Sequence, residues 1–401
     1  MPEILLPAAV TALLGRLRDG GFSAYAVGGC IRDSLLGRPV HDWDITTAAR
    51  PEDTKAVFSD LRTLDTGLRH GTVTVLCENE PYEITTYRID GAYADGRHPD
   101  TVAFTDLLAE DLKRRDFTVN AMAYAPSDGL VDLFGGSEDL QRRLMRAVGD
   151  PAERFTEDAL RILRAVRFAA VLGFSVEEET FSAACALRDR LSMVSGERIC
   201  QEMNKLLCAD SPAQILRKGA PVIAAAWPLA TDSVRKNADC VSSLPARLPL
   251  RLAALFDGTE PSKLCAQLMR LRQSRRVAAE AAAIADTAAA LKEAAEGRMR
   301  SLLGGTSLSV CRDACLLAAA KGTLSPEEAA ARAAQFETWA AQHLCCRRED
   351  LALSGRDLMT LGVPAGTAVG KWLDLLLAEV LEGRLPNTQE ALAEYVRRAL
   401  R

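Results

Sequence analysis

Two aspartates near the N-terminus, Asp42 and Asp44, are separated by a single residue. We expect both on a short strand, where alternate side chains point to the same face. Two carboxylates a few ångströms apart repel each other unless a cation lies between them, and hard oxygen ligands favour Mg²⁺. The pair therefore predicts a magnesium site.

A glycine pair, Gly28 and Gly29, precedes the aspartates, after an apolar run and before a segment of helical composition. Glycine lets the backbone approach a phosphate closely, and the first turn of a helix offers free N–H groups to an anion. A phosphate-binding turn beside a carboxylate-bound metal indicates nucleotidyl or phosphoryl transfer. Each feature alone is more often a plain turn or a solvated strand edge, so the interpretation depends on their combination.

A third carboxylate, Glu83, lies in the β-prone run 82–88. Strand alternation puts Glu83 and Thr85 on one face and Ile84 on the other. Near the aspartates, Glu83 could complete the metal ligation or take the proton from an attacking hydroxyl. The alternative is a polar side chain on an exposed strand face.

The segment 111–123 combines arginines with a carboxylate and an amide. If it is helical, Asp116 and Asn120 are four residues apart and share a face. Together they could hold ribose hydroxyls and favour ribonucleotides, while Arg114 and Arg115 could reach a triphosphate. The alternative for such a cluster is a surface ion pair.

The segment 155–168 contains an aspartate and three arginines at intervals of three: Asp158, Arg161, Arg164 and Arg167. We expect one helix here. Steps of three drift by about 60° around a helix, so Asp158 and Arg167 should lie on nearly opposite sides and cannot both touch one base. We expect Asp158 and Arg161 to contact the base edge with Arg164 beside them. Arg167 would instead reach phosphate, RNA or a structural partner.

The pairing of Asp158 with Arg161 suits two of the four bases. Cytosine and adenine each present an amino donor next to a ring-nitrogen acceptor, which match a carboxylate and a guanidinium. Uracil and guanine place a carbonyl where the amino group would be, and the unpaired charge costs several kcal/mol. The alternative is an ordinary surface ion pair between neighbouring helix turns.

The composition is that of a globular protein, with 48% hydrophobic and 26% charged residues over 401 positions, which suggests two to four domains. The net charge of −5 does not indicate nucleic-acid binding, although a local arginine groove could still bind phosphates. No run of 18 apolar residues and no signal-peptide pattern occurs, so we expect no membrane partner. The 11 cysteines lack zinc-site spacing and predict reduced thiols in a cytoplasmic protein.

The elements that must position these residues change along the chain. Residues 3–19 have the apolar spacing of an amphipathic helix, with Leu5 on its apolar face. Residues 22–135 are mixed, with β-prone runs at 22–27, 44–46, 72–76 and 82–86. After residue 146 the composition is helical, and 278–296 is expected to be a solvated spacer.

Three strings, GGCIRDSLLGRPVHDWDITT, RRDFTVNAMA and EDALRILRAVRF, resemble the motifs of the bacterial class II tRNA nucleotidyltransferase and poly(A) polymerase family. The segments 197–205 and 354–388 resemble later parts of the same family. The resemblance covers most of the chain. It implies an α+β fold with a mixed β-sheet in an N-terminal nucleotidyltransferase head, followed by all-helical neck, body and tail. The implied domains are the head at 1–145, the neck at 146–210, the body at 211–325 and a tRNA-binding tail at 326–401.

The same resemblance implies a reaction, in which C, C and A are added without a template to the 3′ end of tRNA. CTP and ATP would be the substrates, pyrophosphate the second product and Mg²⁺ the cofactor in a two-metal mechanism. Asp42 and Asp44 would hold the metal, and Glu83 matches an acidic catalytic residue beside this pair. The loop 88–99, with Asp95 and Arg97, resembles the flexible loop needed for adding adenosine. The implied nucleotide-binding residues are Gly29, Arg32, Arg115, Asp116, Asn120, Asp158, Arg161, Arg164 and Arg167.

Three alternatives remain open: a poly(A) polymerase, an enzyme that adds only the final A, and a non-catalytic tRNA-binding protein. Poly(A) polymerases of this class tend to be longer, with a basic tail. The Asp42 and Asp44 pair argues against a binding protein, because such a protein has no physical reason to keep a repulsive, metal-dependent pair. No protein partner is inferred.

Overall fold

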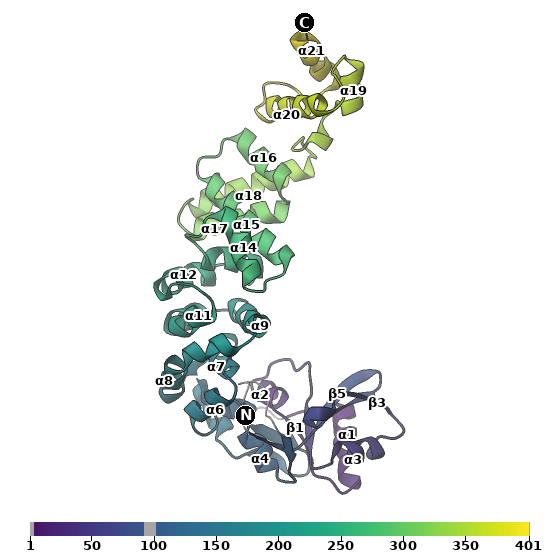
Figure 1. Cartoon of the computed structure of the whole chain (residues 1–401), viewed down its shortest axis with the longest axis vertical. Helices are drawn as coiled ribbons and strands as arrows, with labels where there is room; N and C mark the ends of the chain where they lie inside the picture. The colour runs from purple at the N-terminus through teal and green to yellow at the C-terminus, as the bar shows by residue number, and fades with distance from the viewer. Residues whose placement is uncertain (1–3, 92–101, 401) are drawn as a thin grey trace. The chain divides into compact units, whose positions relative to one another are not determined.

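The computed structural model describes residues 4–91 and 102–400. The chain forms two compact units, Met1–Arg235 and Lys236–Arg401, which divide inside helix α12 (Thr231–Ser243) (Figure 1). Within the described residues all strands belong to the first unit, and the second is helical. The expected α+β class is therefore confirmed, while the finer division at residues 145, 210 and 325 stays a prediction.

A mixed sheet of seven strands forms the head, in the order β3-β4-β5-β2-β1-β8-β9 across the described residues. Its β2 and β5 pair in parallel, with Ile45 opposite Ile84, and the other neighbours are antiparallel. The strands are β1 (Ala24–Val27), β2 (Ile45–Thr47), β3 (Arg62–Gly67), β4 (Thr72–Cys77), β5 (Glu80–Thr86), β8 (Met122–Ala125) and β9 (Gly129–Asp132). Two small sheets add β6 (Arg88–Asp90) with β7 (Val102–Phe104), and β10 (Leu144–Met145) with β11 (Ser175–Val176).

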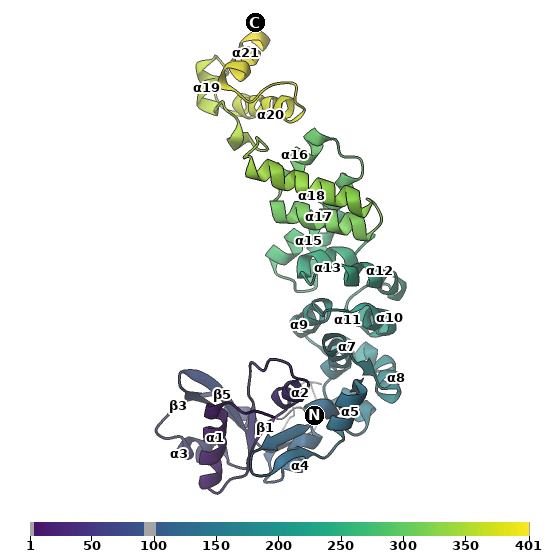
Figure 2. The ribbon, with the colours of Figure 1, turned by 180° about the vertical axis from the view of Figure 1, so that it is seen from behind.

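The head helices are α1 (Ala8–Asp19), α2 (Gly29–Leu35), α3 (Pro51–Val57), α4 (Leu108–Lys113) and α5 (Gly136–Arg142), with 3₁₀ turns η1 (Leu68–His70) and η2 (Thr118–Asn120). In both views α1 and α3 lie side by side (Figures 1 and 2). The expected helix over 3–19 is too long, because α1 begins only after Pro7 and Leu5 is 74% exposed. Burial of Val10, Leu13 and Leu17 still confirms its apolar face.

Helices continue the first unit: α6 (Pro151–Glu157), α7 (Leu160–Leu172), α8 (Glu178–Ala186), η3 (Arg188–Met193), α9 (Gly196–Leu207), α10 (Ala213–Lys218) and α11 (Ala220–Ala226). At the start of α6, the Asp150 carboxylate accepts hydrogen bonds from the backbone N–H groups of Ala152 and Glu153. Helix α7 is buried along most of its length and packs against α9. The pair α7 and α9 therefore forms the core next to the head.

The second unit consists of α13 (Leu248–Leu255), α14 (Pro261–Arg270), α15 (Arg275–Leu291), α16 (Glu296–Gly305), α17 (Leu308–Ala320), α18 (Pro326–Ala341), η4 (Arg348–Asp350), α19 (Gly355–Thr360), α20 (Thr367–Leu381) and α21 (Gln389–Ala399). The expected solvated spacer at 278–296 is wrong. Helix α15 packs against α13, α14 and α17 and buries Ala281, Ile284 and Leu291. The buried alanines, Ala278, Ala281 and Ala288, allow these helices to pack closely on that face.

In the described part of the chain, no helix has the length and apolar character needed to cross a membrane. All 11 cysteines lie in that part and are free thiols.

Candidate active site

A cavity of about 650 Å³ in the first unit collects most of the predicted site residues. Among the described residues, seven basic side chains and five aspartates line it, so its wall has more cationic than anionic groups. Such an excess suits a triphosphate. The lining residues named by the sequence analysis are Gly28, Gly29, Arg32, Asp42, Asp44, Arg114, Arg115, Asp116, Asn120, Asp158, Arg161, Arg164 and Arg167.

Asp42 and Asp44 lie in irregular backbone just before β2, which begins at Ile45, so the strand expected to contain both is wrong. Both nevertheless line the cavity. Asp44 as a whole residue is exposed, yet its carboxyl group is partly removed from water, which raises its pKa. Attraction to Arg115 opposes this shift, and repulsion from Glu83 and Asp42 adds to it. A divalent cation would relieve that repulsion, so the pair fits such a group, with other ligands from water and substrate.

Glu83 lies outside the cavity wall and lines a second cavity of about 710 Å³, which also includes Asp42 and Asp44. Its carboxylate is close enough to raise the pKa of Asp44. The described residues contain no group of three or more His, Cys, Asp or Glu side chains arranged to hold a metal. A role for Glu83 as ligand or base therefore stays a prediction. Asp95 and Arg97, in the expected flexible loop, lie outside the described residues.

The glycine turn brings backbone close to an arginine. Gly28 has φ +87° and ψ −130°, a conformation that L side chains rarely adopt, and its N–H donates to the carbonyl of Met122. A Cβ at this position would lie 3.0 Å from Nη1 of Arg115. Helix α2 begins at Gly29, and its Arg32 also lines the cavity. Glycine at position 28 thus allows the backbone of the turn and the Arg115 guanidinium to lie side by side at the cavity wall.

The expected helix over Asp116 and Asn120 is wrong, because Asp116 lies between α4 and the 3₁₀ turn η2. The two side chains still meet, since Nδ2 of Asn120 donates to Oδ1 of Asp116 at 3.0 Å. Arg32 donates from Nη1 to Oδ1 of Asn120 at 2.6 Å. A ribose hydroxyl that binds here would share these side chains with the arginines around them.

Both Arg114 and Arg115 are paired with the buried Asp111. The shortest contacts are 2.6 Å from Arg114 Nη2 to Oδ1 and 3.2 Å from Arg115 Nη2 to Oδ2. Burial raises the pKa of Asp111, but the two arginines outweigh it, so the carboxyl pKa is lowered. Asp111 therefore orients both guanidinium groups at the cavity wall.

The expected single helix over 155–168 is broken at Asp158, which has extended backbone between α6 and α7. Because Asp158 is not part of the same helix as the arginines, the rotation expected along one helix does not apply to it. Four charged residues therefore line the same cavity: Asp158, Arg161, Arg164 and Arg167. Nη1 of Arg161 donates to Glu157 at 2.6 Å, and its Nη2 donates to the carbonyl of Arg114 at 2.9 Å. The expectation that Asp158 and Arg167 lie on opposite sides is thus wrong for this fold.

Arg167 has a structural partner, which is one of the three roles that the sequence analysis left open for it. Its Nε donates to Oε2 of the buried Glu202 on α9 at 2.6 Å, and Arg164 lies 3.8 Å from Oε1 of the same carboxylate. Burial lowers the pKa of Arg167 and outweighs the attraction of Glu202. The guanidinium carbons of Arg32, Arg164 and Arg167 lie 5.2, 5.1 and 3.4 Å from the centroid of the Phe168 ring. One aromatic ring therefore contacts three arginines, and one carboxylate pairs with two of them.

The sequence analysis assigned no individual role to five residues of this region. Asp33, Phe168 and Lys205 line the cavity, while Arg198 and Glu202 bond to residues that line it. A usable signal existed for Glu202, which interrupts the apolar face of α9 between Ile199 and Met203. A charge at such a position predicts a buried ion pair. No comparable signal marks Arg198, because it is only partly buried and does not interrupt the apolar face of α9.

Family models match three parts of the chain. The model described as "Poly A polymerase head domain" matches residues 24–146. The model described as "Probable RNA and SrmB- binding site of polymerase A" matches 173–218, and that for tRNA nucleotidyltransferase domain 2 matches 253–396.

Curated relatives are similar over nearly the whole length. The CCA-adding enzyme of Limosilactobacillus fermentum is 37% identical over 391 residues, which cover 95% of this chain and 94% of the relative. That of Levilactobacillus brevis is 35% identical over 397 residues, 96% of each.

Solved structures have the same architecture. The Bacillus stearothermophilus CCA-adding enzyme in complex with CTP matches with a TM-score of 0.82 at 32% identity, over 99% of this chain and 98% of that one. The Thermotoga maritima CCA-adding enzyme complexed with tRNA_CCA matches with a TM-score of 0.70 at 22% identity, over 100% and 97%, and shares the fold. The chain belongs to the CCA-adding enzymes, a family of tRNA nucleotidyltransferases.

Proposed function

We propose that this enzyme adds C, C and A to the 3′ end of tRNA, from CTP and ATP, with release of pyrophosphate and without a nucleic-acid template. One observation supports this above the others: a single cavity is lined by the Asp42 and Asp44 pair, the glycine turn and the Asp158 and Arg161 pair. Chemistry, triphosphate binding and base selection can therefore take place on one bound nucleotide.

The triphosphate would bind at the glycine turn. The backbone of Gly29 at the start of α2 and the guanidinium groups of Arg32 and Arg115 would neutralise and orient it. Asp111 orients Arg115, and Asn120 orients Arg32, so neither arginine has to be ordered by the substrate. Asp116 and Asn120 lie beside them and would contact the ribose.

Asp42 and Asp44 would hold the divalent cations, for which we propose Mg²⁺ because its other ligands would be water and substrate phosphates. When bound, Mg²⁺ supplies Lewis-acid activation of the primer hydroxyl and charge neutralisation at the triphosphate. Glu83, which lines the adjoining second cavity, would accept the proton of that hydroxyl or complete the metal ligation.

Base selection would depend on Asp158 and Arg161. The carboxylate accepts a hydrogen bond from the amino group of C or A, and the guanidinium donates to the adjacent ring nitrogen. Uracil and guanine would present a carbonyl oxygen to the carboxylate and would be rejected, because the two oxygens repel each other and the hydrogen bond from an amino group is lost. Arg164 and Arg167 line the same cavity and would limit how the base can turn.

The helical remainder would hold the tRNA acceptor arm, with residues 146–210 as neck, 211–325 as body and 326–401 as a tRNA-binding tail. Contacts to phosphates and to the shape of the RNA would dominate, so binding should weaken as salt rises. We expect the reaction in the cytoplasm, in keeping with the free thiols of all 11 cysteines.

Primer extension on a denaturing gel tests the proposal. tRNA ending at the discriminator base, at C or at CC is offered each nucleoside triphosphate singly and CTP with ATP together. Three additions that end in CCA are expected. Addition of A to the CC primer alone would make this an A-adding enzyme, a long A ladder would make it a poly(A) polymerase, and no addition in Mg²⁺ would contradict catalysis.

A further inference from the structure

Four exposed arginines cluster where α14 ends and α15 begins: Arg270, Arg272, Arg275 and Arg276. No aspartate or glutamate occurs in the sequence between Glu260 and Glu280, so the charges of this stretch are all positive. The whole chain has a net charge of −5. A surface of one positive sign on an acidic protein indicates an anionic partner.

The backbone of this turn is fixed without the arginine side chains. Helix α14 ends in a Schellman motif, in which the N–H of Arg272 donates to the carbonyl of Met269 at 3.0 Å. The N–H of Gln273 donates to the carbonyl of Leu268 at 3.1 Å. The Ser274 hydroxyl then caps α15, and the two helices pack against each other. The arginines therefore project from a rigid base, and their replacement should leave the fold intact.

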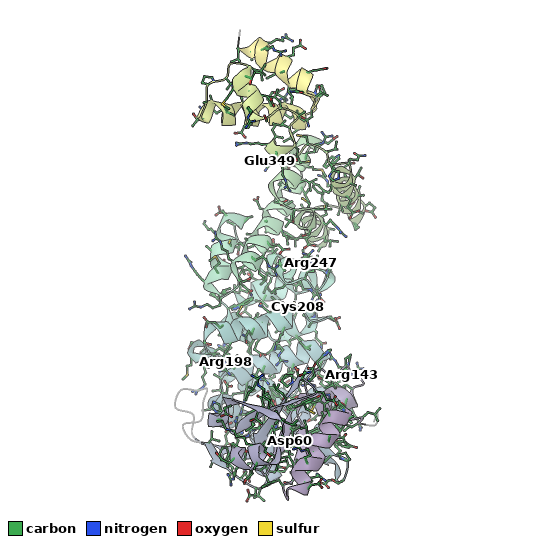
Figure 3. The ribbon with its side chains drawn as sticks, turned by 90° about the vertical axis from the view of Figure 1, so that its right-hand side faces the viewer. Asp60, Arg143, Arg198, Cys208, Arg247 and Glu349 are labelled. Carbon is green, nitrogen blue, oxygen red and sulfur yellow. The ribbon has the colours of Figure 1, made fainter. Side chains whose placement is uncertain are left out.

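Other exposed arginines of the second unit are neutralised by carboxylates. Arg247, labelled in Figure 3, is 41% exposed and still donates to Asp313 at 2.8 Å and to Glu280 at 3.0 Å. Among residues 4–91 and 102–400, by contrast, no carboxylate forms an ion pair with three arginines of the turn: Arg270, Arg275 and Arg276. Their mutual repulsion is not relieved by an ion pair within these residues, so an anionic ligand would bind here without displacing an internal partner.

The chemistry of the turn suits phosphates better than a protein surface. A guanidinium group has a planar set of donors that matches two phosphate oxygens. The exposed side chains of residues 270–276 are four arginines and a serine, and Met269 is an exposed apolar neighbour. A protein interface has an apolar centre from which charged residues are depleted, and this turn has the opposite composition.

We propose that Arg270, Arg275 and Arg276 bind backbone phosphates of the tRNA substrate. The inference rests on the proposed function and adds a contact in the second unit to the nucleotide cavity of the first. Residues 270–276 span at most about 20 Å, so the surface covers a few phosphates. Contacts to phosphates position an RNA without reading its sequence, so different tRNAs would be bound alike.

The salt dependence of tRNA binding tests the inference. The triple variant Arg270→Gln, Arg275→Gln and Arg276→Gln removes three charges and keeps polar side chains of similar length. Each lost phosphate contact lowers the slope of log affinity against log salt concentration by about 0.7, so the slope should fall by about 2. The Kd for tRNA at low salt, measured by filter retention, should rise at least about tenfold. The KM for CTP should stay within about twofold, because the turn is not part of the nucleotide cavity.

A second triple variant is the matched control: Lys55→Gln, Arg142→Gln and Arg312→Gln. It removes the same positive charge from exposed or half-buried side chains that are each paired with a carboxylate. Its Kd for tRNA should stay within about twofold of the wild type, with an unchanged salt slope. The comparison separates loss of particular contacts from a change in net charge.

An unchanged Kd and salt slope in the Arg270, Arg275 and Arg276 variant would overturn the inference and leave the turn to another partner. Equal losses in both triple variants would overturn it too, because net charge alone would explain them. If the first variant has a lowered melting temperature, Arg270→Gln and Arg276→Gln decide separately, each with an expected slope change of about 0.7. Failure of the proposed function is distinguishable, because filter retention needs no catalysis: a wild type that binds tRNA but adds no C or A would contradict that function alone.

Discussion

Arg164 donates two hydrogen bonds to one oxygen of Asp116, at 2.8 Å from Nε and 2.6 Å from Nη2, across 48 residues of sequence. This ion pair joins α7 to the segment that follows α4. It connects α7, which contains Arg161, the proposed base-selecting arginine, to the part of the head beside Arg115, a proposed triphosphate ligand. Stability of the first unit and geometry of the site therefore depend on the same contact.

The pair makes stability depend on pH. Burial raises the pKa of Asp116, but attraction to Arg164 and a hydrogen bond from Asn120 outweigh it and lower the pKa to about 2. The folded state thus binds this proton more weakly than the unfolded state, whose value is 3.8. The contribution, about 2 kcal/mol, is present above pH 4 and is lost as pH falls from 4 toward 2.

Asp116→Asn should therefore lower the free energy of unfolding at pH 7 by at least about 2 kcal/mol, since Arg164 also loses its buried partner. Urea unfolding between pH 3 and pH 7, followed by circular dichroism, measures the difference from the wild type. That difference should shrink as pH falls below 4. A difference that stays constant over this range would show that protonation of Asp116 is not coupled to unfolding.

Asp42→Ala tests the metal-binding assignment. Loss of one carboxylate ligand should reduce incorporation to below about one thousandth, because metal catalysis supplies several kcal/mol. tRNA binding, measured by filter retention, should stay within about twofold of the wild type. Asp19→Ala, at an exposed position at the end of α1, is the control and should leave both unchanged. Retained incorporation in Asp42→Ala would refute the assignment.

Arg161→Ala tests base selection directly. Its guanidinium is the proposed donor to the ring nitrogen, so kcat/KM for CTP and ATP should fall at least about tenfold relative to UTP and GTP. Arg142→Ala, which removes an exposed arginine paired with Glu138 on α5, should leave the ratios as they are. If the variant still discriminates against UTP and GTP as the wild type does, the proposal that Arg161 selects C and A is wrong.

Gly28→Ala tests the phosphate-binding turn. The added Cβ would lie 3.0 Å from Arg115 Nη1 and would force φ +87° on a residue with a side chain. We expect the KM for CTP to rise at least about tenfold. Gly366→Ala is a matched control, because Gly366 also precedes a helix, with φ +100° and ψ −137°, but a Cβ there meets nothing within 4 Å. Equal effects of the two substitutions would indicate strain alone and not displacement of Arg115.

The sequence predicted the elements whose signals are local. The runs 72–76 and 82–86 correspond to β4 and β5, and the apolar spacing of α1 corresponds to its buried face. The order of motifs also indicated the α+β class. Local patterns failed where tertiary contacts decide the structure: α15 has the composition of a solvated helix, yet one face of it, with Ala278, Ala281 and Ala288, is buried because three helices pack on it.

The site shows the same limit. Residue types identified Asp42, Asp44, Asp158 and Arg161, and the cavity contains all four. The regular geometry assumed for them was wrong, because the chain is irregular before β2 and breaks at Asp158. Supporting residues such as Glu202 come from α9, and folding brings them to partners that are distant in the sequence. Motif spacing could therefore not specify these partners.

The most direct test offers the wild-type enzyme a tRNA that ends at the discriminator base, with all four nucleoside triphosphates and Mg²⁺ present. Mass spectrometry of the released 3′ fragment then gives the added sequence. The account predicts C, C and A as the dominant product, because the enzyme itself rejects UTP and GTP. A product with U or G among the added residues, or with an extended run of A, would contradict protein-directed CCA addition.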